Sequence, residues 1–183
     1  MKHIGLILLV WFGINRAGQE IYVCKNAVIT LYSKAPIEDI EARSDRGTSV
    51  FNATTGDLAF SVPIRSFKFD KALMQEHFNE NYMESDKYPQ ASFKGKFTEK
   101  PDISKDGSYA VNVTGVLDVH GVKQTRTIPG KIVVNGGTVS MSSEFMVACK
   151  DHKIDIPQLV FHNIAEKLRI NVSAVYSPYK ANP

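Results

Sequence analysis

The strongest constraint on the fold is a regular alternation of apolar and polar residues in the second half of the chain. Val111, Val113 and Leu117 take alternate positions, and Asn112 and Thr114 lie between them. A period of two places the two kinds of side chain on opposite sides of an extended strand. The same alternation recurs over residues 21–33, 58–64, 91–97, 128–134, 139–149 and 168–176. The sequence therefore predicts a protein built mainly from strands that each have one apolar side.

The number of these runs and the turn signals between them limit the possible architectures. With an irregular, charged stretch at 37–52, the runs make about eight strands. Asn135-Gly136-Gly137 predicts a tight hairpin, and Pro157 suits the first turn of a short helix over residues 155–166. Eight half-apolar strands form a two-sheet sandwich or an up-and-down barrel, which is either filled by side chains or holds one small ligand. The residue pattern alone leaves these alternatives open.

A first helical segment is expected within residues 67–97. Asp70 is predicted as its N-cap, because a carboxylate accepts hydrogen bonds from the first free backbone N–H groups. Leu73, Met74 and Phe78 follow at helical spacing and share one apolar side. Tyr88-Pro89 is expected to end the helix, since proline lacks a donor and favours extended geometry before it. We expect this segment to cover the sheet as a plug or lid.

Small residues lie among the large ones on the expected apolar sides. Gly95, Gly115 and Gly130 are followed along the chain by Ser143 and Ala174 at inward positions. Small inward residues leave volume, which favours a cavity. Glycines also mark the points where strands bend as a barrel coils. Both interpretations fit the sequence.

The start of the chain resembles a secretory signal. Residues 1–18 contain a short basic start, an apolar run over 4–14 and the small pair Ala17-Gly18. Without Lys2 and Arg16, the chain has 20 basic against 19 acidic residues, too small an excess for electrostatic nucleic-acid binding. We therefore expect an exported protein, periplasmic or secreted, with one domain over residues 19–183 and no nucleic-acid partner.

Few residues in the chain suggest covalent or metal chemistry. Cys24 and Cys149 are an even pair that could form a disulfide in an oxidising compartment, or could stay free as small buried groups. Asp118 and His120 are two residues apart on one strand face, as two metal ligands or a base and its orienting partner would be. No third partner and no catalytic motif accompany them, so we predict no catalytic residue and no metal site.

Three segments resemble the YceI-like proteins in order and spacing: HFNENYMESDKYPQASFKG from His77, GVLDVHGVKQTRTIPG from Gly115, and FMVACKDHKIDIP from Phe145. The opening IYVCKNAVITLYSKAP departs from the common pattern of that family. The resemblance implies a mainly β fold, an eight-stranded antiparallel lipocalin-like barrel with two short helical insertions. It also implies an exported bacterial protein that binds the isoprenoid tail of a lipid or quinone in a hydrophobic pore.

With that resemblance, strand alternation gives a set of expected cavity-lining residues, of which Phe78, Met83 and Tyr88 would form an end-stop or gate. The set is Phe60, Val62, Phe78, Met83, Tyr88, Phe93, Phe97, Val111, Val113, Leu117, Ile132, Met141, Phe145, Val147, Ile170 and Val172. We expect a carrier that needs no cofactor. Peripheral membrane contact stays open, as does a monomer or a homodimer paired through an exposed first or last strand. The alternatives are a ligand-free interaction or stress-response module and a metal-dependent enzyme that uses Asp118 and His120.

Overall fold

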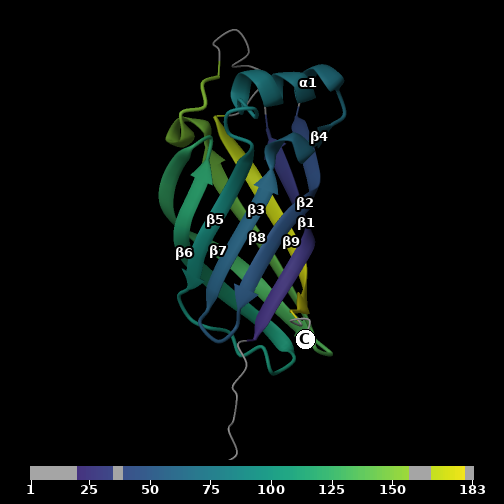
Figure 1. Ribbon diagram of the computed structural model, residues 1–183, viewed down its shortest axis with the longest axis vertical. Helices are drawn as coiled ribbons and strands as arrows, with labels where there is room; N and C mark the ends of the chain where they lie inside the picture. Colours follow the sequence, from purple (N-terminus) through teal and green to yellow (C-terminus); the bar gives the residue numbers. More distant parts are fainter. Residues whose placement is uncertain (1–19, 35–38, 157–165, 180–183) are drawn as a thin grey trace, which may run out of the picture.

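The alternating runs form eight long strands and one short one. The computed structural model describes residues 20–34, 39–156 and 166–179 (Figure 1). The charged stretch at 37–52 proves to be a single strand from Ile40, irregular in register on either side of Gly47. The strands are β1 (Ile21–Ser33), β2 (Ile40–Asn52), β3 (Asp57–Pro63), β4 (Lys68–Phe69), β5 (Gln90–Phe97), β6 (Gly107–Val119), β7 (Val122–Asn135), β8 (Thr138–Ala148) and β9 (Lys167–Pro178).

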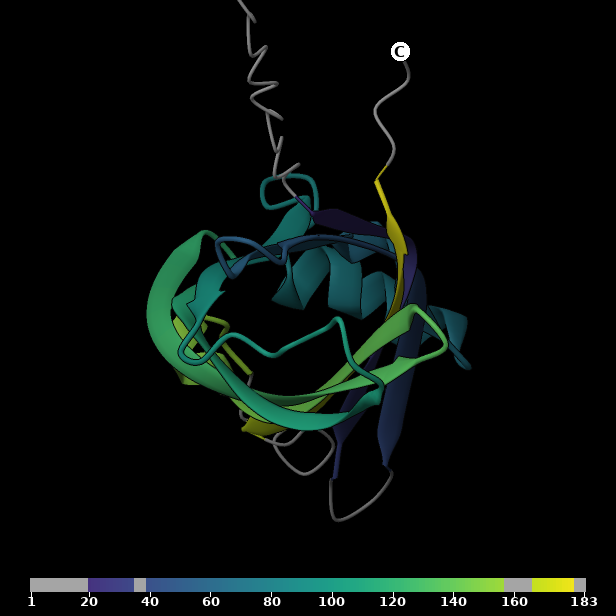
Figure 2. The same cartoon turned by 90° about the horizontal axis from the view of Figure 1, so that it is seen from below.

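The eight long strands close into a barrel. Their order is β1-β9-β8-β7-β6-β5-β3-β2, all pairs are antiparallel, and β1 also pairs with β2. Figure 2 shows these strands surrounding a common interior. The predicted eight-stranded antiparallel barrel is therefore confirmed, and the sandwich is excluded. Both terminal strands are paired on both sides, so the expectation that an exposed first or last strand could join two barrels is wrong.

Two hairpins have the turn chemistry that the sequence indicates. Gly136 and Gly137 connect β7 to β8 with positive φ angles of 53° and 79°, which confirms the predicted tight turn. His120 and Gly121 connect β6 to β7 with φ angles of 53° and 69°. Two consecutive residues with positive φ match the turn type whose twist suits antiparallel strands. Each of these hairpins brings its two apolar strand faces into register on the inside.

Short helices cover one end of the barrel, called the cap end. They are η1 (Ile64–Ser66), α1 (Ala72–His77), η2 (Phe78–Tyr82) and η3 (Cys149–His152). The expected N-cap was wrong by one residue: Lys71 precedes α1 and makes no side-chain capping bond. The helical segment also ends at Tyr82, before Tyr88-Pro89, because Glu84 already has a φ of 42°.

Two expected segments fall outside the described residues. The signal at residues 1–18 is one of them, and nearly all of the second helix, over 157–165, is the other. Within the described part of the chain, no helix is long and apolar enough to cross a membrane.

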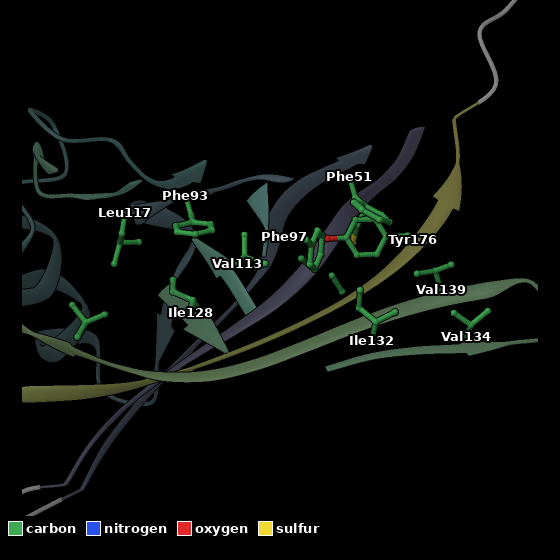
Figure 3. Packing of buried hydrophobic residues seen from close by; sticks show 14 residues of the cluster. Phe51, Phe93, Phe97, Val113, Leu117, Ile128, Ile132, Val134, Val139 and Tyr176 are labelled. Atoms are coloured by element: carbon green, nitrogen blue, oxygen red, sulfur yellow. The ribbon is translucent and has the colours of Figure 1, made fainter. Parts of the chain in front are cut away.

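Aromatic rings fill the opposite end, called the ring end. Phe51 packs edge-on against Phe97 at 5.2 Å between ring centroids and against Tyr176 at 6.4 Å. Figure 3 shows these three side chains gathered together, with Phe93 further along the interior. Phe51 is only 1% exposed, so these rings close the barrel interior at the ring end.

The hydroxyl of Tyr176 is satisfied inside this cluster. It lies 2.6 Å from Ser49 Oγ, and Ser49 donates its own proton to the carbonyl of Ala59 at 2.9 Å. Tyr176 is therefore the donor to Ser49. Burial raises the pKa of Tyr176 to about 12 from 10.0. The folded protein thus holds this phenol in its neutral form.

This shift predicts a loss of stability at high pH. Because the folded pKa lies above the unfolded value, the contribution of Tyr176 is complete below pH 10 and disappears as the pH rises through about 12. The full loss is about 3 kcal/mol at most. Urea unfolding at pH 9 and at pH 11.5 should show a steeper decline for the wild type than for Tyr176→Phe. Equal declines in both proteins would show that Tyr176 does not carry the effect.

Candidate functional site

An apolar cavity lies inside the barrel between the ring end and the cap end. Its volume is about 190 Å³, taken as the space in which the centre of a water-sized sphere can move. All eight long strands contribute side chains to it, as Ile29 on β1, Phe93 on β5 and Ile170 on β9 illustrate. On the same measure, one water molecule needs roughly 10–15 Å³. The cavity therefore has room for an extended chain of apolar groups.

The structure places all but one of the expected lining residues on this cavity. Its wall includes Phe60, Val62, Phe78, Met83, Phe93, Phe97, Val111, Val113, Leu117, Ile132, Met141, Phe145, Val147, Ile170 and Val172. Apart from Phe78 and Met83, which lie in and just after η2, these residues alternate along their strands, so one side of each strand is enough to identify them. The alternation also pointed to Ile29, Leu31, Ile128 and Leu168, which line the cavity but were left out of the expected set.

Tyr88 is the exception, and its expected position was wrong. Its ring packs edge-on against the imidazole of His120 at 4.5 Å and covers the Gly121 turn. A Cβ atom on Gly121 would lie 2.5 Å from Tyr88 Cε1. Tyr88 follows a turn instead of continuing a strand, so no periodic pattern fixes where it points. It supports the β6–β7 hairpin outside the cavity.

The inward glycines serve two different purposes. Gly95 and Gly115 are paired across β5 and β6, and a Cβ on Gly115 would lie 2.2 Å from the Lys94 carbonyl oxygen and 2.4 Å from Gly95 Cα. Only glycine permits this approach. Gly130 instead lines the cavity, where an added Cβ would lie 3.6 Å from Val111 Cγ2. Gly95 and Gly115 therefore allow β5 and β6 to approach each other closely, whereas Gly130 lies on the cavity wall.

A second apolar cavity of about 310 Å³, on the same measure, lies under α1 at the cap end. Leu73 and Met74 from α1 line it, together with Phe69 from β4. Phe78 and Met83 line both this cavity and the interior one. Phe78 is held by Phe67 and Phe69, with ring centroids at 5.7 and 4.9 Å. Leu31, Cys149, Ile154 and Leu168 also line both cavities, so Phe78 and Met83 lie among the side chains where the two cavities adjoin.

The side chain of His120 makes hydrogen bonds within the fold, and it does not share a strand face with Asp118. The strand ends at Val119, and the turn buries His120 to 9% exposure. Its Nδ1 lies 3.1 Å from the His152 carbonyl oxygen, and its Nε2 lies 2.8 Å from Glu84 Oε2. Both partners accept, so His120 satisfies both only when each ring nitrogen carries a proton. The shared-face prediction is wrong, because His120 lies in the turn.

The remaining candidates for covalent or metal chemistry are also accounted for by packing. Cys24 and Cys149 are both free and buried. Cys24 packs in the cluster that includes the ring end, whereas Cys149 packs with Ile64 and Met83 at the cap end. Burial raises the pKa of the Cys149 thiol. In the described ranges, no three His, Cys, Asp or Glu side chains gather into a metal-binding group.

The fold is shared with solved bacterial proteins. A polyisoprenoid binding domain from Saccharophagus degradans, implicated in plant cell wall breakdown, has a TM-score of 0.74 at 12% identity, over 88% of this chain and 100% of that one. BcnA from Burkholderia cenocepacia has a TM-score of 0.70 at 18% identity, over 82% of this chain and 96% of that one. A YCEI protein from Campylobacter jejuni has 0.61 at 15% identity, over 79% and 88%.

These identities establish the likeness of fold alone. No curated protein matches the chain. The sequence profile of the YceI-like domain matches residues 27–176, which run from the middle of β1 almost to the end of β9. This match covers nearly the whole barrel and confirms the resemblance found in the three sequence segments. The chain therefore belongs to the family of proteins with a YceI-like domain.

Proposed function

We propose that this protein holds an isoprenoid-tailed lipid or quinone in its barrel and carries or sequesters it without a catalytic step. The observation that supports this most directly is the interior cavity, whose wall is apolar and is built from all eight long strands. Membership of a YceI-like family, and the fold shared with a domain described as polyisoprenoid binding, agree with it.

The chemistry of the tail fits such a site. An isoprenoid tail has no hydrogen-bonding groups, so its binding needs apolar area and no polar partner. Burying about 300 Å² of tail at ~25 cal/mol per Å² contributes on the order of 7 kcal/mol before ordering costs. The interior cavity and the cap cavity meet at Phe78 and Met83. A tail longer than the interior could therefore extend past these side chains into the cap.

Organic extraction of the purified native protein tests the proposal. Mass spectrometry of the extract should find an isoprenoid-tailed molecule, and the stripped protein should rebind an added isoprenoid quinone. The intact protein mass, from the same material, should show the loss of residues 1–18 if the protein is exported to the periplasm or secreted.

Other outcomes would favour the alternatives. A clean extract with no rebinding would favour a ligand-free barrel that acts as an interaction or stress-response module. A stoichiometric metal that raises the melting temperature would favour a metal-dependent protein, and the His120 environment described above would then have to rearrange.

A further inference from the structure

A short connection, residues 83–89, joins η2 to β5. Glu84 turns the backbone there with a φ of 42°, and its carbonyl accepts hydrogen bonds from the N–H groups of Lys87 at 2.8 Å and Tyr88 at 2.9 Å. Met83, the residue before Glu84, lines both the interior cavity and the cap cavity. The turn therefore sets the position of Met83 and the direction of the Glu84 side chain together.

His120 joins this connection to two other segments. Its Nε2 lies 2.8 Å from Glu84 Oε2, and its Nδ1 lies 3.1 Å from the carbonyl oxygen of His152 in η3. Its own backbone is fixed in the β6–β7 turn with a φ of 53°. The ring of Tyr88, from the same connection, packs edge-on against the imidazole at 4.5 Å. One side chain thus holds the connection, the hairpin and η3 together.

The two hydrogen bonds of His120 depend on one titratable proton. Both partners are acceptors, so a neutral imidazole, with one N–H, can serve only one of them. The side chain of Glu84 is 44% exposed, whereas His152, with its carbonyl, is 0% exposed. Water can replace His120 as the partner of an exposed carboxylate, but a buried carbonyl left unpaired has a higher cost. Loss of the proton should therefore break the bond to Glu84 and keep the bond to His152.

The charged groups around His120 agree with this response. Lys87 Nζ lies 3.8 Å from Glu84 Oε1 and 4.9 Å from the centre of the Tyr88 ring, so it stabilises Glu84 as a carboxylate whatever the charge of His120. In the same connection, Asp86 forms an ion pair with Arg65. The charged residues that the hairpin and η3 add within the described part of the chain lie at exposed or half-exposed positions; they are Asp118, Lys123, Lys150 and Asp151.

His152 has the opposite requirement. Its Nδ1 donates to the carbonyls of Val119 at 3.3 Å and Val122 at 3.1 Å. Its Nε2 is buried and has no hydrogen-bond partner among the described residues. A second proton on this ring would be buried without an acceptor, so the fold favours neutral His152. Falling pH therefore weakens the fold through His152, whereas rising pH weakens it through His120.

The cap segment, defined as α1 and η2 over residues 72–82, depends on the connection for its anchorage. Figure 1 shows α1 lying across the cap end of the barrel. No residue of α1 or η2, both of which the structure describes in full, is buried, and Leu73 is 61% exposed. Segments with little buried surface open at a low cost in free energy. Met83 and Ser85, by contrast, are buried, so the connection fixes the cap segment to the barrel.

We propose that the hydrogen bond between Glu84 and His120 is a pH-sensitive contact that controls opening of the cap segment. While both ring nitrogens carry protons, His120 holds the connection, and Phe78 and Met83 keep their places where the two cavities adjoin. When the pH rises and the imidazole loses one proton, Glu84 is released and the cap segment opens more often. This goes beyond the proposed function, because it concerns access to the cavities and needs no assumption about what they hold.

Hydrogen exchange of the delipidated full chain, followed by mass spectrometry, tests this contact. The informative amides include those of Met83 and Ser85, which donate to the carbonyls of Phe78 at 2.9 Å and Asn79 at 2.8 Å. After correction for the intrinsic rise of exchange with pH, their protection should fall about tenfold between pH 6 and pH 9, as one charge-assisted hydrogen bond is lost. The paired residues of β8 and β9 should keep their protection over the same range.

Glu84→Gln is the variant that separates a proton-dependent contact from a structural one. A carboxamide accepts from a protonated Nε2 and donates to an unprotonated one, so the hydrogen bond persists at both pH values. This variant should fold normally and lose the decline in protection. Glu80→Gln makes the same change of charge at an exposed site in η2, and His77→Gln removes an exposed imidazole from α1. Both controls should decline as the wild type does.

Three results would overturn the proposal. The first is equal protection of the cap amides at pH 6 and pH 9 in the wild type, and the second is a decline that persists in Glu84→Gln. The third is loss of the decline in His77→Gln, which would assign the effect to another histidine. Because the protein carries no ligand in this measurement, each of these results leaves the carrier function as it stands.

Discussion

Replacing Gly115 with alanine is expected to destabilise the protein by about 3 kcal/mol or more. The added Cβ would lie 2.2 Å from one backbone atom of β5 and 2.4 Å from another, so the strands themselves must separate. Relief by a side-chain rotation is not available, because both obstructing atoms belong to the main chain. Since typical domains are stable by about 5–15 kcal/mol, a loss of this size should be plain in a urea unfolding curve.

Gly130→Ala is the matched control. This glycine also faces inward, but the nearest atom to its added Cβ is the Ser142 carbonyl oxygen at 3.1 Å, and the next is 3.6 Å away. We expect a cost of roughly 1 kcal/mol or less. Unfolding midpoints that differ little between the two variants would contradict the close approach of β5 and β6.

Val113→Lys is expected to reduce lipid binding about a hundredfold or more, since an ammonium group in the apolar cavity must be desolvated when the tail enters. Val113 is 6% exposed and lies between Phe97 on β5 and Ile128 on β7. Titration of stripped protein with an isoprenoid quinone measures the loss. Asn112→Lys is the control, because it places the same charge at the adjacent exposed position on the outer face.

A second variant guards against simple unfolding of the first. Val111→Phe keeps the wall apolar and extends a ring towards Gly130, where the strand pair lacks a side chain. It should fold with a normal melting temperature and weaken binding about tenfold, which corresponds to ~60 Å² of lost tail contact. Undiminished binding by folded forms of both variants would show that the ligand lies elsewhere.

The barrel and most of its lining could be predicted from the sequence because both depend on one local rule. Along β6, side chains two positions apart share a face whatever the neighbouring strand does, so Val111, Val113 and Leu117 had to lie on the same side. Closure of the strands then turns that side into the inner wall. Whether lipid touches these residues is a separate matter that the binding experiments address.

Features set by turns and by long-range contacts could not be predicted in this way. His120 continues the sequence pattern of β6, but a positive φ turns it into the β6–β7 hairpin. Tyr88 looks like the end of an aromatic series, yet it packs on that hairpin because the helical segment ends early, at Tyr82. Each position depends on where distant segments meet, which strand alternation does not encode.

The incomplete pairing of β7 with β8 agrees with one residue of the sequence. Pro129 lies within a strand-like run, and a proline there argues for an edge rather than for the middle of a sheet. The structure shows that β7 is bonded on one side at this point and on both sides further on.

The way the barrel closes has a consequence for shortened forms of the protein. Around the wall, each pairing joins long strands that follow one another in the chain, with only the short β4 between β3 and β5, apart from the contact of β1 with β9. The pairing of the first strand with the last therefore closes the barrel. A chain that ends before residue 167 would lack β9, so the barrel would open into a curved sheet. Both edge strands of that sheet would have unpaired backbone groups, which favour association with other chains.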